Sequence, residues 1–406
     1  MIKEIKIFLI LLVLFISIST VSAEGNFTSL QKEIDSSTDS IEITQDYVYD
    51  NTTDFELNSG ILINKSNYVI NGNGYTIDGS NQARIFTILS DNVTISNINL
   101  INGNGDKNPG GSIFSLGSVT LNNVTFKQNY GFEGGAIFSM NPLVISNSAF
   151  TDNIAKWGGN VYCLNDIAIF NSTFSNSAST YAAAIYSQGN FISIINSVFE
   201  NLHANETAGA IGLKEVNEIE IINCTFINAT ANKNAGAVYI DFGTNEESEG
   251  TLIVNSTFIN SSGDFGGALV QLMSNLTIIN SSFINNTSEY DGGAVYASYT
   301  NIYLENTSFK SNKITYDYLF NGGAIYCDMA EFTSISSTFT NNTKNAIYAY
   351  DSNMSIITNE FKNNSESIHR VFGENILLKD NEYNEDILIL NDTNLISVVI
   401  GTGMEL

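Results

Sequence analysis

The sequence is poor in proline, tryptophan and basic residues. Its 406 residues include 2 prolines and 1 tryptophan, and only 14% are charged, which excludes a disordered tail and a collagen-like repeat. Lysine and arginine total 16 against 42 aspartates and glutamates, giving a formal net charge of -26. A surface of this sign repels phosphate backbones and anionic lipid headgroups, so we expect no nucleic-acid partner.

Cysteine is also scarce. The three cysteines are Cys163, Cys224 and Cys327, an odd number that cannot pair completely. Cys163 and Cys327 hold equivalent places in the repeat described below but lie six repeats apart. At about 4.8 Å per repeat this is roughly 29 Å, well beyond the ~7 Å limit for a disulfide. We therefore expect buried free thiols.

The first 23 residues are typical of an export signal. Lys3 and Lys6 give a positive start, Ile7–Ile18 is an apolar run, and Val21-Ser22-Ala23 is a small-residue cleavage site. We find no other segment suited to cross a bilayer as a helix, so we expect no transmembrane helix after cleavage. The expected location is extracellular, at the cell surface or in the envelope. About 20 Asn-x-Ser/Thr sequons suggest a glycoprotein if the host glycosylates exported chains.

Internal repeats dominate the rest of the chain. Two motifs alternate in one phase with a spacing of about 25 residues. The first is a phenylalanine flanked by Asn, Ser and Thr, at Phe126, Phe150, Phe174, Phe199, Phe226, Phe258, Phe283, Phe309, Phe339 and Phe361. The second is Gly-Gly-Ala-Ile-Tyr or a close variant, beginning at Gly134, Gly158, Ala235, Gly292 and Gly322.

A unit of this length fits one coil of a solenoid. Each repeat holds short β-prone runs bounded by Asn, Ser or Gly, such as Leu252-Ile253-Val254, and no run reaches helical length. We predict an all-β fold, a right-handed parallel β-helix of about a dozen coils. The expected organisation is a signal peptide (1–23), an N-terminal cap and first strands (24–60), the β-helix (61–395) and a C-terminal tail (396–406). A short helix with a Thr28…Gln31 capping box would place Phe27, Leu30 and Ile34 on the first coil.

Equivalent residues of successive coils should lie over one another. The phenylalanines and the Ile/Val of the second motif are apolar throughout, so we expect them to form the core. The Asn three places before most of these phenylalanines, such as Asn171 and Asn196, tolerates a left-handed bend and can bond the same amide in the next coil. The Gly-Gly pair is expected at a tight bend where a Cβ would clash.

Two surface features are candidate binding sites. Neighbours of an inward aliphatic column should face outward, and they would form an aromatic stripe suited to a sugar ring or a partner protein, or a purely structural ladder. The stripe consists of Phe138, Tyr162, Tyr186, Tyr239, Tyr296, Tyr326 and Tyr348. The two longest repeats carry insertions that would bulge from one side. Their candidate residues are Glu246, Glu247, Glu249, Tyr316 and Tyr318.

The sequence offers little catalytic chemistry. Polysaccharide lyases and hydrolases need clustered carboxylates with a basic group nearby. Arg84, His203, His369 and Arg370 are the basic candidates, and none has matched acids one coil away, so we interpret Arg84 and His369-Arg370 as solvated surface residues. Asn71–Gly79 is similar to a calcium-binding nonapeptide, but it occurs once, and such sites depend on tandem copies. We expect no catalytic residue, no metal site and no cofactor.

The motifs resemble those of known surface proteins. The Gly-Gly-Ala-Ile-Tyr and Phe-x-x-Asn motifs (Phe126 to Asn129, Phe150 to Asn153, Phe309 to Asn312) look like the repeats of chlamydial polymorphic membrane proteins. The segment Ile70–Gly79, followed by Ala83-Arg84-Ile85-Phe86, more closely resembles adhesin-like right-handed β-helix proteins of methanogenic archaea. The resemblance implies a pectin-lyase-like fold, a cell-surface or envelope location and an adhesive role without a known catalytic set.

The preferred functional prediction is an exported, non-enzymatic adhesin. It would bind a cell-surface glycan or a protein of another cell through the lateral face of the rod. The alternatives are a polysaccharide lyase or hydrolase-like β-helix enzyme and a purely structural envelope protein.

Overall fold

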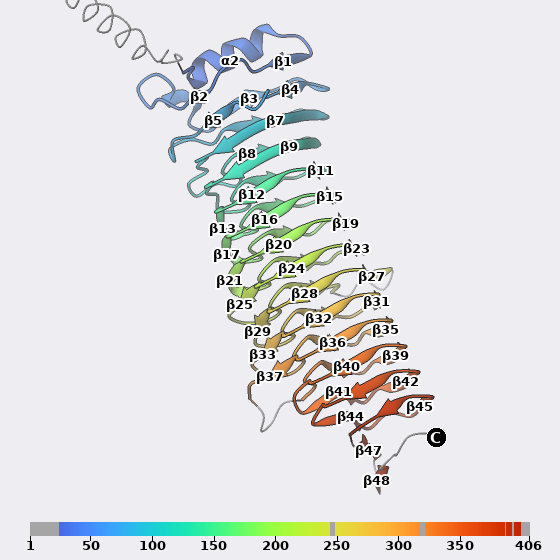
Figure 1. Cartoon of the computed structure of the whole chain (residues 1–406). Helices are drawn as coiled ribbons and strands as arrows, with labels where there is room; N and C mark the ends of the chain where they lie inside the picture. Colours follow the sequence, from blue (N-terminus) through green and yellow to red (C-terminus); the bar gives the residue numbers. More distant parts are fainter. Residues whose placement is uncertain (1–23, 244–247, 317–320, 386, 392–393, 399–406) are drawn as a thin grey trace, which may run out of the picture.

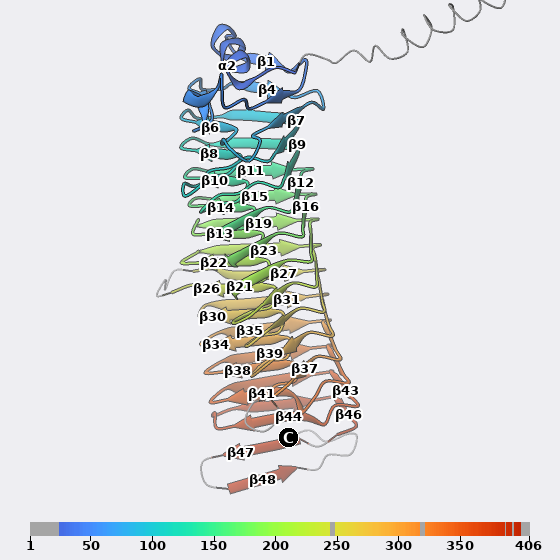
Figure 2. The same cartoon turned by 90° about the vertical axis from the view of Figure 1, so that its left-hand side faces the viewer.

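The computed structural model describes residues 24–243, 248–316, 321–385, 387–391 and 394–398. These residues form a right-handed parallel β-helix of about 13 turns, which confirms the predicted fold class. Figures 1 and 2 show the coils stacked into one rod along which the chain advances coil by coil. The predicted signal segment, residues 1–23, lies outside the described residues.

Three sheets form the lateral faces of the rod. Sheet A has 26 strands in two tracks, joined because β7 and β9 are long enough to belong to both, while sheet B has 15 strands and sheet C has 7. The first track of sheet A contains β1 (Ser40–Glu42), β4 (Val69–Asn71), β7 (Val93–Ile101), β9 (Val119–Lys127), β11 (Leu143–Ser146), β15 (Ile167–Phe170), β19 (Phe191–Ile195), β23 (Glu218–Ile222), β27 (Gly250–Val254), β31 (Asn275–Ile279), β35 (Asn301–Glu305), β39 (Glu331–Ile335), β42 (Asn353–Ile357) and β45 (Ile376–Lys379). The second track adds β2 (Tyr47–Val48), β5 (Thr76–Asp78), β12 (Ala149–Thr151), β16 (Thr173–Ser175), β20 (Val198–Glu200), β24 (Thr225–Ile227), β28 (Thr257–Ile259), β32 (Ser282–Ile284), β36 (Ser308–Lys310), β40 (Thr338–Thr340), β43 (Glu360–Lys362) and β46 (Glu382–Tyr383).

Sheets B and C meet along the Gly-Gly turns. Sheet B contains β3 (Ile61–Ile63), β6 (Phe86–Ile88), β8 (Ile113–Ser115), β10 (Ile137–Ser139), β14 (Val161–Cys163), β18 (Ile185–Ser187), β22 (Ile211–Lys214), β26 (Val238–Asp241), β30 (Leu269–Leu272), β34 (Val295–Ser298), β38 (Ile325–Asp328), β41 (Asn345–Tyr350), β44 (Glu366–Val371), β47 (Ile387–Asn391) and β48 (Asn394–Val398). Sheet C contains β13 (Ile154–Trp157), β17 (Ala178–Tyr181), β21 (His203–Thr207), β25 (Thr230–Ala231), β29 (Ser262–Gly263), β33 (Thr287–Ser288) and β37 (Lys313–Ile314). A middle coil therefore passes from sheet B through both tracks of sheet A to sheet C.

The core consists of continuous apolar columns. Phe258 and Phe283 stack with ring centroids 4.7 Å apart and ring planes 3° from parallel. Similar stacking joins the phenylalanines from Phe126 to Phe361 and continues to Tyr383. The aliphatic column of sheet B is fully buried at most positions. Because equivalent side chains lie over one another, both predicted core columns are confirmed.

Two asparagine ladders run along the rod. In the predicted one, Asn171, Asn196 and Asn223 have φ between 48° and 54°, and Nδ2 of Asn223 donates to Oδ1 of Asn196 at 3.0 Å. The second ladder is buried and was not predicted. Its Asn312 Oδ1 accepts from the backbone N–H and the Nδ2 of Asn286, both at 3.0 Å. The Phe-x-x-Asn motif thus places an amide side chain where it pairs with the buried hydrogen-bonding groups of a turn.

The Gly-Gly turns have the predicted reason for glycine. Gly134 has a φ of +66°, and a Cβ added there would lie 1.9 Å from the carbonyl oxygen of Ile137. A Cβ added to Gly135 would lie 2.1 Å from the carbonyl oxygen of Gly159 in the next coil. The pair therefore combines a left-handed turn with a close approach between coils. This turn forms the corner between sheets C and B, beside the candidate site.

The two ends of the rod are closed differently. Helix α2 (Phe27–Ser36) packs on the first strands and buries Phe27, Leu30 and Ile34, as predicted. Its capping box joins Asn26 and Ser29, so the helix begins earlier than the predicted Thr28…Gln31 box. The 3-10 helix η1 (Phe55–Leu57) follows in the loop before β3. At the other end, β47 and β48 form an antiparallel pair that extends sheet B across the predicted boundary at residue 395.

The three cysteines are buried and free, as predicted. Burial raises the pKa of the Cys163 and Cys327 thiols to about 12. Such thiols are protonated at neutral pH and do not act as nucleophiles. All three cysteines are therefore part of the buried core.

Candidate functional site

The predicted aromatic stripe exists as a half-buried ladder on sheet B. The ring centroids of Tyr162 and Tyr186 are 5.1 Å apart with the ring planes tilted by 34°, and Tyr296 and Tyr326 stack at the same distance with ring planes 2° apart. Phe138, at the start of the stripe, is only 4% exposed. The ladder itself extends further, from Phe114 to His369. Its tyrosines are half-buried.

The ladder is interrupted in the middle of the rod. Gly212 of β22 lies in register between Tyr186 and Tyr239, so a whole ring is missing there. The ladder also lacks a ring in the next coil, where Val270 is the partner of Tyr239 in register. This second position differs from Gly212, because Val270 is only 2% exposed and the Phe265 ring contacts Tyr296 nearby, with centroids 5.5 Å apart. The gap at Gly212 is left open.

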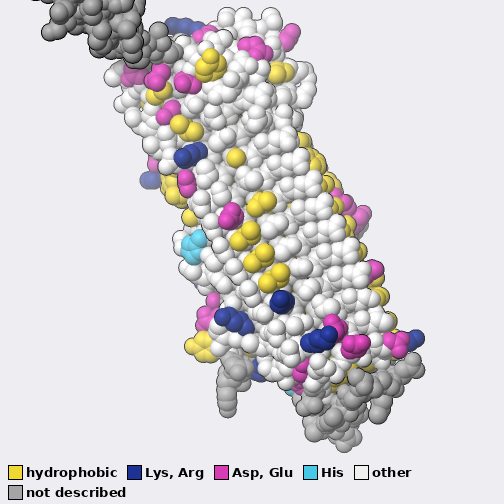
Figure 3. Space-filling model, viewed as in Figure 1, with side chains coloured by type: hydrophobic (Ala, Val, Ile, Leu, Met, Phe, Trp, Pro, Cys, Tyr) yellow, Lys and Arg dark blue, Asp and Glu magenta, His cyan; other side chains and the backbone are white. Residues whose placement is uncertain are grey.

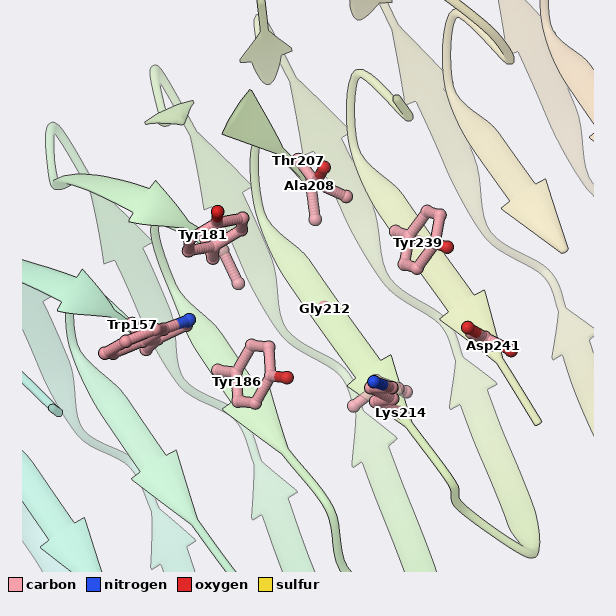
Figure 4. Close-up of a pocket in the computed structure, with 11 residues that line it drawn as sticks. Trp157, Tyr181, Tyr186, Thr207, Ala208, Gly212, Lys214, Tyr239 and Asp241 are labelled. Carbon is pink, nitrogen blue, oxygen red and sulfur yellow. The ribbon is translucent and has the colours of Figure 1, made fainter. Parts of the chain in front are cut away.

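A cleft of about 250 Å³ occupies this gap at the corner of sheets B and C (Figure 4). Tyr186 and Tyr239 flank it on sheet B. Trp157, Tyr181 and Thr207, which end successive strands of sheet C in register, form its second side. The full lining is Trp157, Tyr181, Ala182, Tyr186, Thr207, Ala208, Gly212, Leu213, Lys214, Tyr239 and Asp241. Gly212 thus stands where the coils on both sides carry aromatic rings, and Thr207 is a small residue in register with Tyr181.

One charge of each sign lies at the far rim of the cleft. Lys214 and Asp241 are partners in register on β22 and β26, and Figure 4 shows both beyond the two tyrosines, toward the ends of these strands. Burial, followed by the charges of Asp241 and Tyr186, raises the pKa of Tyr239 to about 12. Its hydroxyl is protonated at neutral pH and can donate a hydrogen bond. The cleft therefore combines aromatic faces with both donors and acceptors.

An apolar ridge adjoins the cleft on the sheet C side. Trp157 stacks on Tyr181 with centroids 5.8 Å apart and contacts Phe132 edge to face at 5.4 Å. Lys156 Nζ lies 4.1 Å from the centre of the Trp157 ring. Phe132 is 37% exposed and Ile154 50% exposed. Exposed rings next to an aromatic cleft give a ligand longer than one ring a surface to lie on.

Sequence reasoning missed most of this site. The prediction named Tyr186 and Tyr239 but not Trp157, Tyr181, Lys214 or Asp241. The aligned ladder positions of successive repeats contained a usable signal for the gap, because Gly212 is the one glycine among the aromatic residues between Phe114 and Tyr239. The only tryptophan of the chain, beside it, was a second signal.

Of the predicted insertion residues, the two that the structure describes, Glu249 and Tyr316, do not line the cleft. Glu246, Glu247 and Tyr318 lie outside the described residues. Glu249 is exposed before β27, whereas Tyr316, 59% exposed, follows β37. Figure 1 places β27 and β37 on opposite sides of the rod. Glu249 and Tyr316 are therefore not on one side of the rod.

The interpretation of the two arginines as solvated surface residues is wrong. Arg84 is 8% exposed and Arg370 1% exposed. Arg84 donates to the carbonyl oxygens of Ser59, Pro109 and Gly110 at 2.9–3.0 Å. Burial lowers its pKa to about 10, so it stays charged. These guanidinium groups satisfy turn carbonyls that the local coil geometry leaves unpaired.

Carboxyl groups with altered acidity lie near the later part of the ladder. Burial raises the pKa of Asp291 to about 6, and the charge of Asp328 adds to this rise. Two groups oppose the rise: the backbone N–H of Asn321, which donates to Asp291 Oδ1 at 2.7 Å, and the charge of Lys344. The pKa of Asp328 is also raised, mainly by burial, and its Oδ1 is buried without a hydrogen-bond partner. Asp291 is therefore a carboxyl that can carry a proton near neutral pH.

Metal and membrane sites are not evident in the described ranges. Within them, no three His, Cys, Asp or Glu side chains gather in a way that would hold a metal ion. No helix there is long and apolar enough to cross a bilayer. Figure 3 shows that the face in view is largely uncharged, with a row of hydrophobic side chains across successive coils.

Three solved structures match this chain over most of its length. The A-module of the Azotobacter vinelandii mannuronan C-5 epimerase AlgE6 is 11% identical, with a match that covers 91% of this chain and 95% of the module, at a TM-score of 0.40. An alginate lyase in complex with a trisaccharide is 10% identical over 94% and 88%, with a TM-score of 0.35. The alginate lyase AlyF-OU02, solved with G6, is 10% identical over 95% and 91%, with a TM-score of 0.33. No protein-family model and no curated protein matches the chain.

These neighbours correct one prediction. We expected a chain that is not an enzyme, and the comparison contradicts this prediction: the solved structures that match are described as two alginate lyases and a mannuronan C-5 epimerase. At this low identity the likeness concerns the fold. Any binding or catalytic role has to be argued from the residues of this chain.

Proposed function

We propose that this chain is an exported polysaccharide-active β-helix protein that binds a glycan at the corner of sheets B and C. The observation that carries the proposal is the cleft between Tyr186 and Tyr239, with Lys214 and Asp241 at its rim. The apolar faces of sugar rings stack on aromatic side chains, while their hydroxyls need donors and acceptors at the edge. The predicted location outside the cell and the resemblance to archaeal surface proteins are part of this proposal.

A direct binding test uses the single tryptophan. Trp157 lines the cleft, so its fluorescence reports a ligand that enters. We expect at least one soluble polysaccharide to change the emission in a saturable way and to retard the protein in affinity electrophoresis. Tyr181→Ser should weaken this binding by removing a ring that stacks on Trp157, whereas Phe55→Ser, at an exposed ring in η1, should leave it unchanged. Equal binding by both variants, or no binding by the unaltered protein, would refute the proposal.

A second candidate function is cleavage of the bound glycan, and Asp291 is the observation that favours it. A general acid works best when its pKa lies near the working pH, and the pKa of Asp291 is raised to about 6. Its charge also reaches the ladder tyrosines Tyr296 and Tyr326. A glycan that extended along the ladder from the cleft would pass this carboxyl.

Product analysis tests the second candidate. New reducing ends report cleavage by either hydrolysis or elimination, and ultraviolet absorbance of unsaturated sugar products distinguishes elimination. We expect Asp291→Asn to abolish product formation while the Trp157 fluorescence response is retained. Undiminished cleavage by this variant would exclude Asp291 as the acid, and binding without any product would leave the chain as a glycan-binding protein.

A further inference from the structure

The gap at Gly212 has no backbone cause. The φ of Gly212 is outside the left-handed range, unlike that of Gly134 in the turns. A Cβ added to Gly212 would meet the Cβ of Ala182 at 3.1 Å and the ring of Tyr186 at 3.4 Å, so a methyl group there needs its neighbours to move by only a few tenths of an ångström. Glycine in a strand interior weakens the strand and often marks a place where another molecule approaches. The missing ring is therefore a feature of the surface and not a requirement of the fold.

The width of the gap equals one missing ring. Gly212 lies one coil from Tyr186 and one coil from Tyr239, so the two tyrosines are about 9.6 Å apart at about 4.8 Å per coil. Elsewhere in the ladder the centroids of adjacent rings are 5.1–5.5 Å apart. A single ring inserted at Gly212 would therefore contact both tyrosines at the spacing that the ladder uses throughout.

The surroundings of the gap favour an uncharged ring with hydroxyl groups. Lys214 and Asp241 offer one cation and one anion at the rim, which together suit hydroxyls that both accept and donate. Thr207 and the two tyrosine hydroxyls add further polar atoms. The whole chain carries a formal charge of -26, which repels a polyanion. A neutral sugar meets all three conditions.

We propose that the gap at Gly212 is a subsite that takes one neutral pyranose ring between Tyr186 and Tyr239 and thereby completes the aromatic ladder. This deepens the proposed function, on which it rests, by naming the ring position and the class of sugar. The remaining sugars of the chain would lie over Trp157, Tyr181 and the ridge at Phe132. Insertion of one ring fixes the register of the glycan on the rod, since its neighbours must continue from that point.

The test replaces the inserted ring by a side chain of the ladder. Gly212→Tyr fills the gap with the residue type of the adjacent coils, and Gly212→Ala adds a methyl group at the same position but leaves the gap open. Titration calorimetry and Trp157 fluorescence would be recorded with cellohexaose, mannohexaose, chitohexaose and an alginate hexasaccharide. We expect a neutral hexasaccharide to bind, Gly212→Ala to keep its affinity within about threefold, and Gly212→Tyr to lose at least about tenfold, or about 1.4 kcal/mol.

Each other outcome has a defined meaning. If Gly212→Tyr does not fold, Tyr239→Leu serves instead, because it removes one wall of the gap and should also lose affinity. Unchanged binding by the variants would overturn the insertion while the proposed function stands. Tighter binding of the alginate hexasaccharide than of any neutral sugar would overturn the neutral class. Failure of all glycans to bind the unaltered protein would overturn both this inference and the proposed function.

Discussion

Asp291 makes the stability of this protein depend on pH in a calculable way. Its pKa is raised from 3.8 to about 6 by folding, so the folded state favours the protonated carboxyl. The resulting stabilisation is complete below pH 3.8 and is lost as the pH rises through 6. Two pKa units correspond to about 3 kcal/mol. Solvent screening of this partly exposed group reduces the expected effect to about 1–2 kcal/mol.

Asp291→Asn removes the titration and keeps an oxygen that can accept from the N–H of Asn321. The variant should match the unaltered protein at pH 4 and exceed its free energy of unfolding by about 1–2 kcal/mol at pH 7. Urea unfolding followed by circular dichroism at pH 4, 5, 6 and 7 measures this difference. Asp106→Asn, at an exposed turn position with a positive φ that Asn tolerates, controls for the loss of one negative charge. The reasoning fails if both variants show the same pH profile.

Three further outcomes follow from the fold. Asn312→Leu should lower the free energy of unfolding by about 2–6 kcal/mol, because it leaves the buried N–H of Asn286 and another interior group without a partner; Asn301→Leu, in an exposed amide pair, should cost below about 0.5 kcal/mol by the same denaturation assay. Gly134→Ala should destabilise strongly, since its Cβ would lie 1.9 Å from a carbonyl oxygen, whereas Gly74→Ala meets nothing within 4 Å; similar melting temperatures for the two would contradict the close approach. Cys327, fully buried with its pKa raised to about 12, should react with a thiol reagent at pH 8 only after denaturation, and rapid native labelling would disprove its burial.

The periodic parts of this molecule could be predicted from the sequence. The Phe258 and Phe283 stack, the left-handed Asn196 and the bend at Gly134 all occur many times in equivalent form. Repetition reveals such residues because the same side chain must fit the same environment in every coil. The right-handed sense follows from the general preference of parallel crossovers.

The candidate site could not be predicted in the same way, because it arises where the repeat fails. Gly212 and Thr207 are ordinary residues on their own, and they form a cleft only because Tyr186, Tyr181 and Tyr239 surround them. Their proximity depends on the exact register between coils of unequal length, which motif spacing does not supply. The prediction that Arg84 is exposed failed for a related reason, because its carbonyl partners lie in the turns of neighbouring coils.

The parallel stacking of coils also means that distances along the surface come in fixed increments. Gly212 and Asp291 are on coils separated by a small whole number of windings, each about 4.8 Å high. Duplicating or deleting one winding between them would move the two positions apart or together by that step while leaving the side chains around each untouched. Evolution or protein engineering can therefore change the spacing between two surface positions of the rod by changing only the number of coils between them.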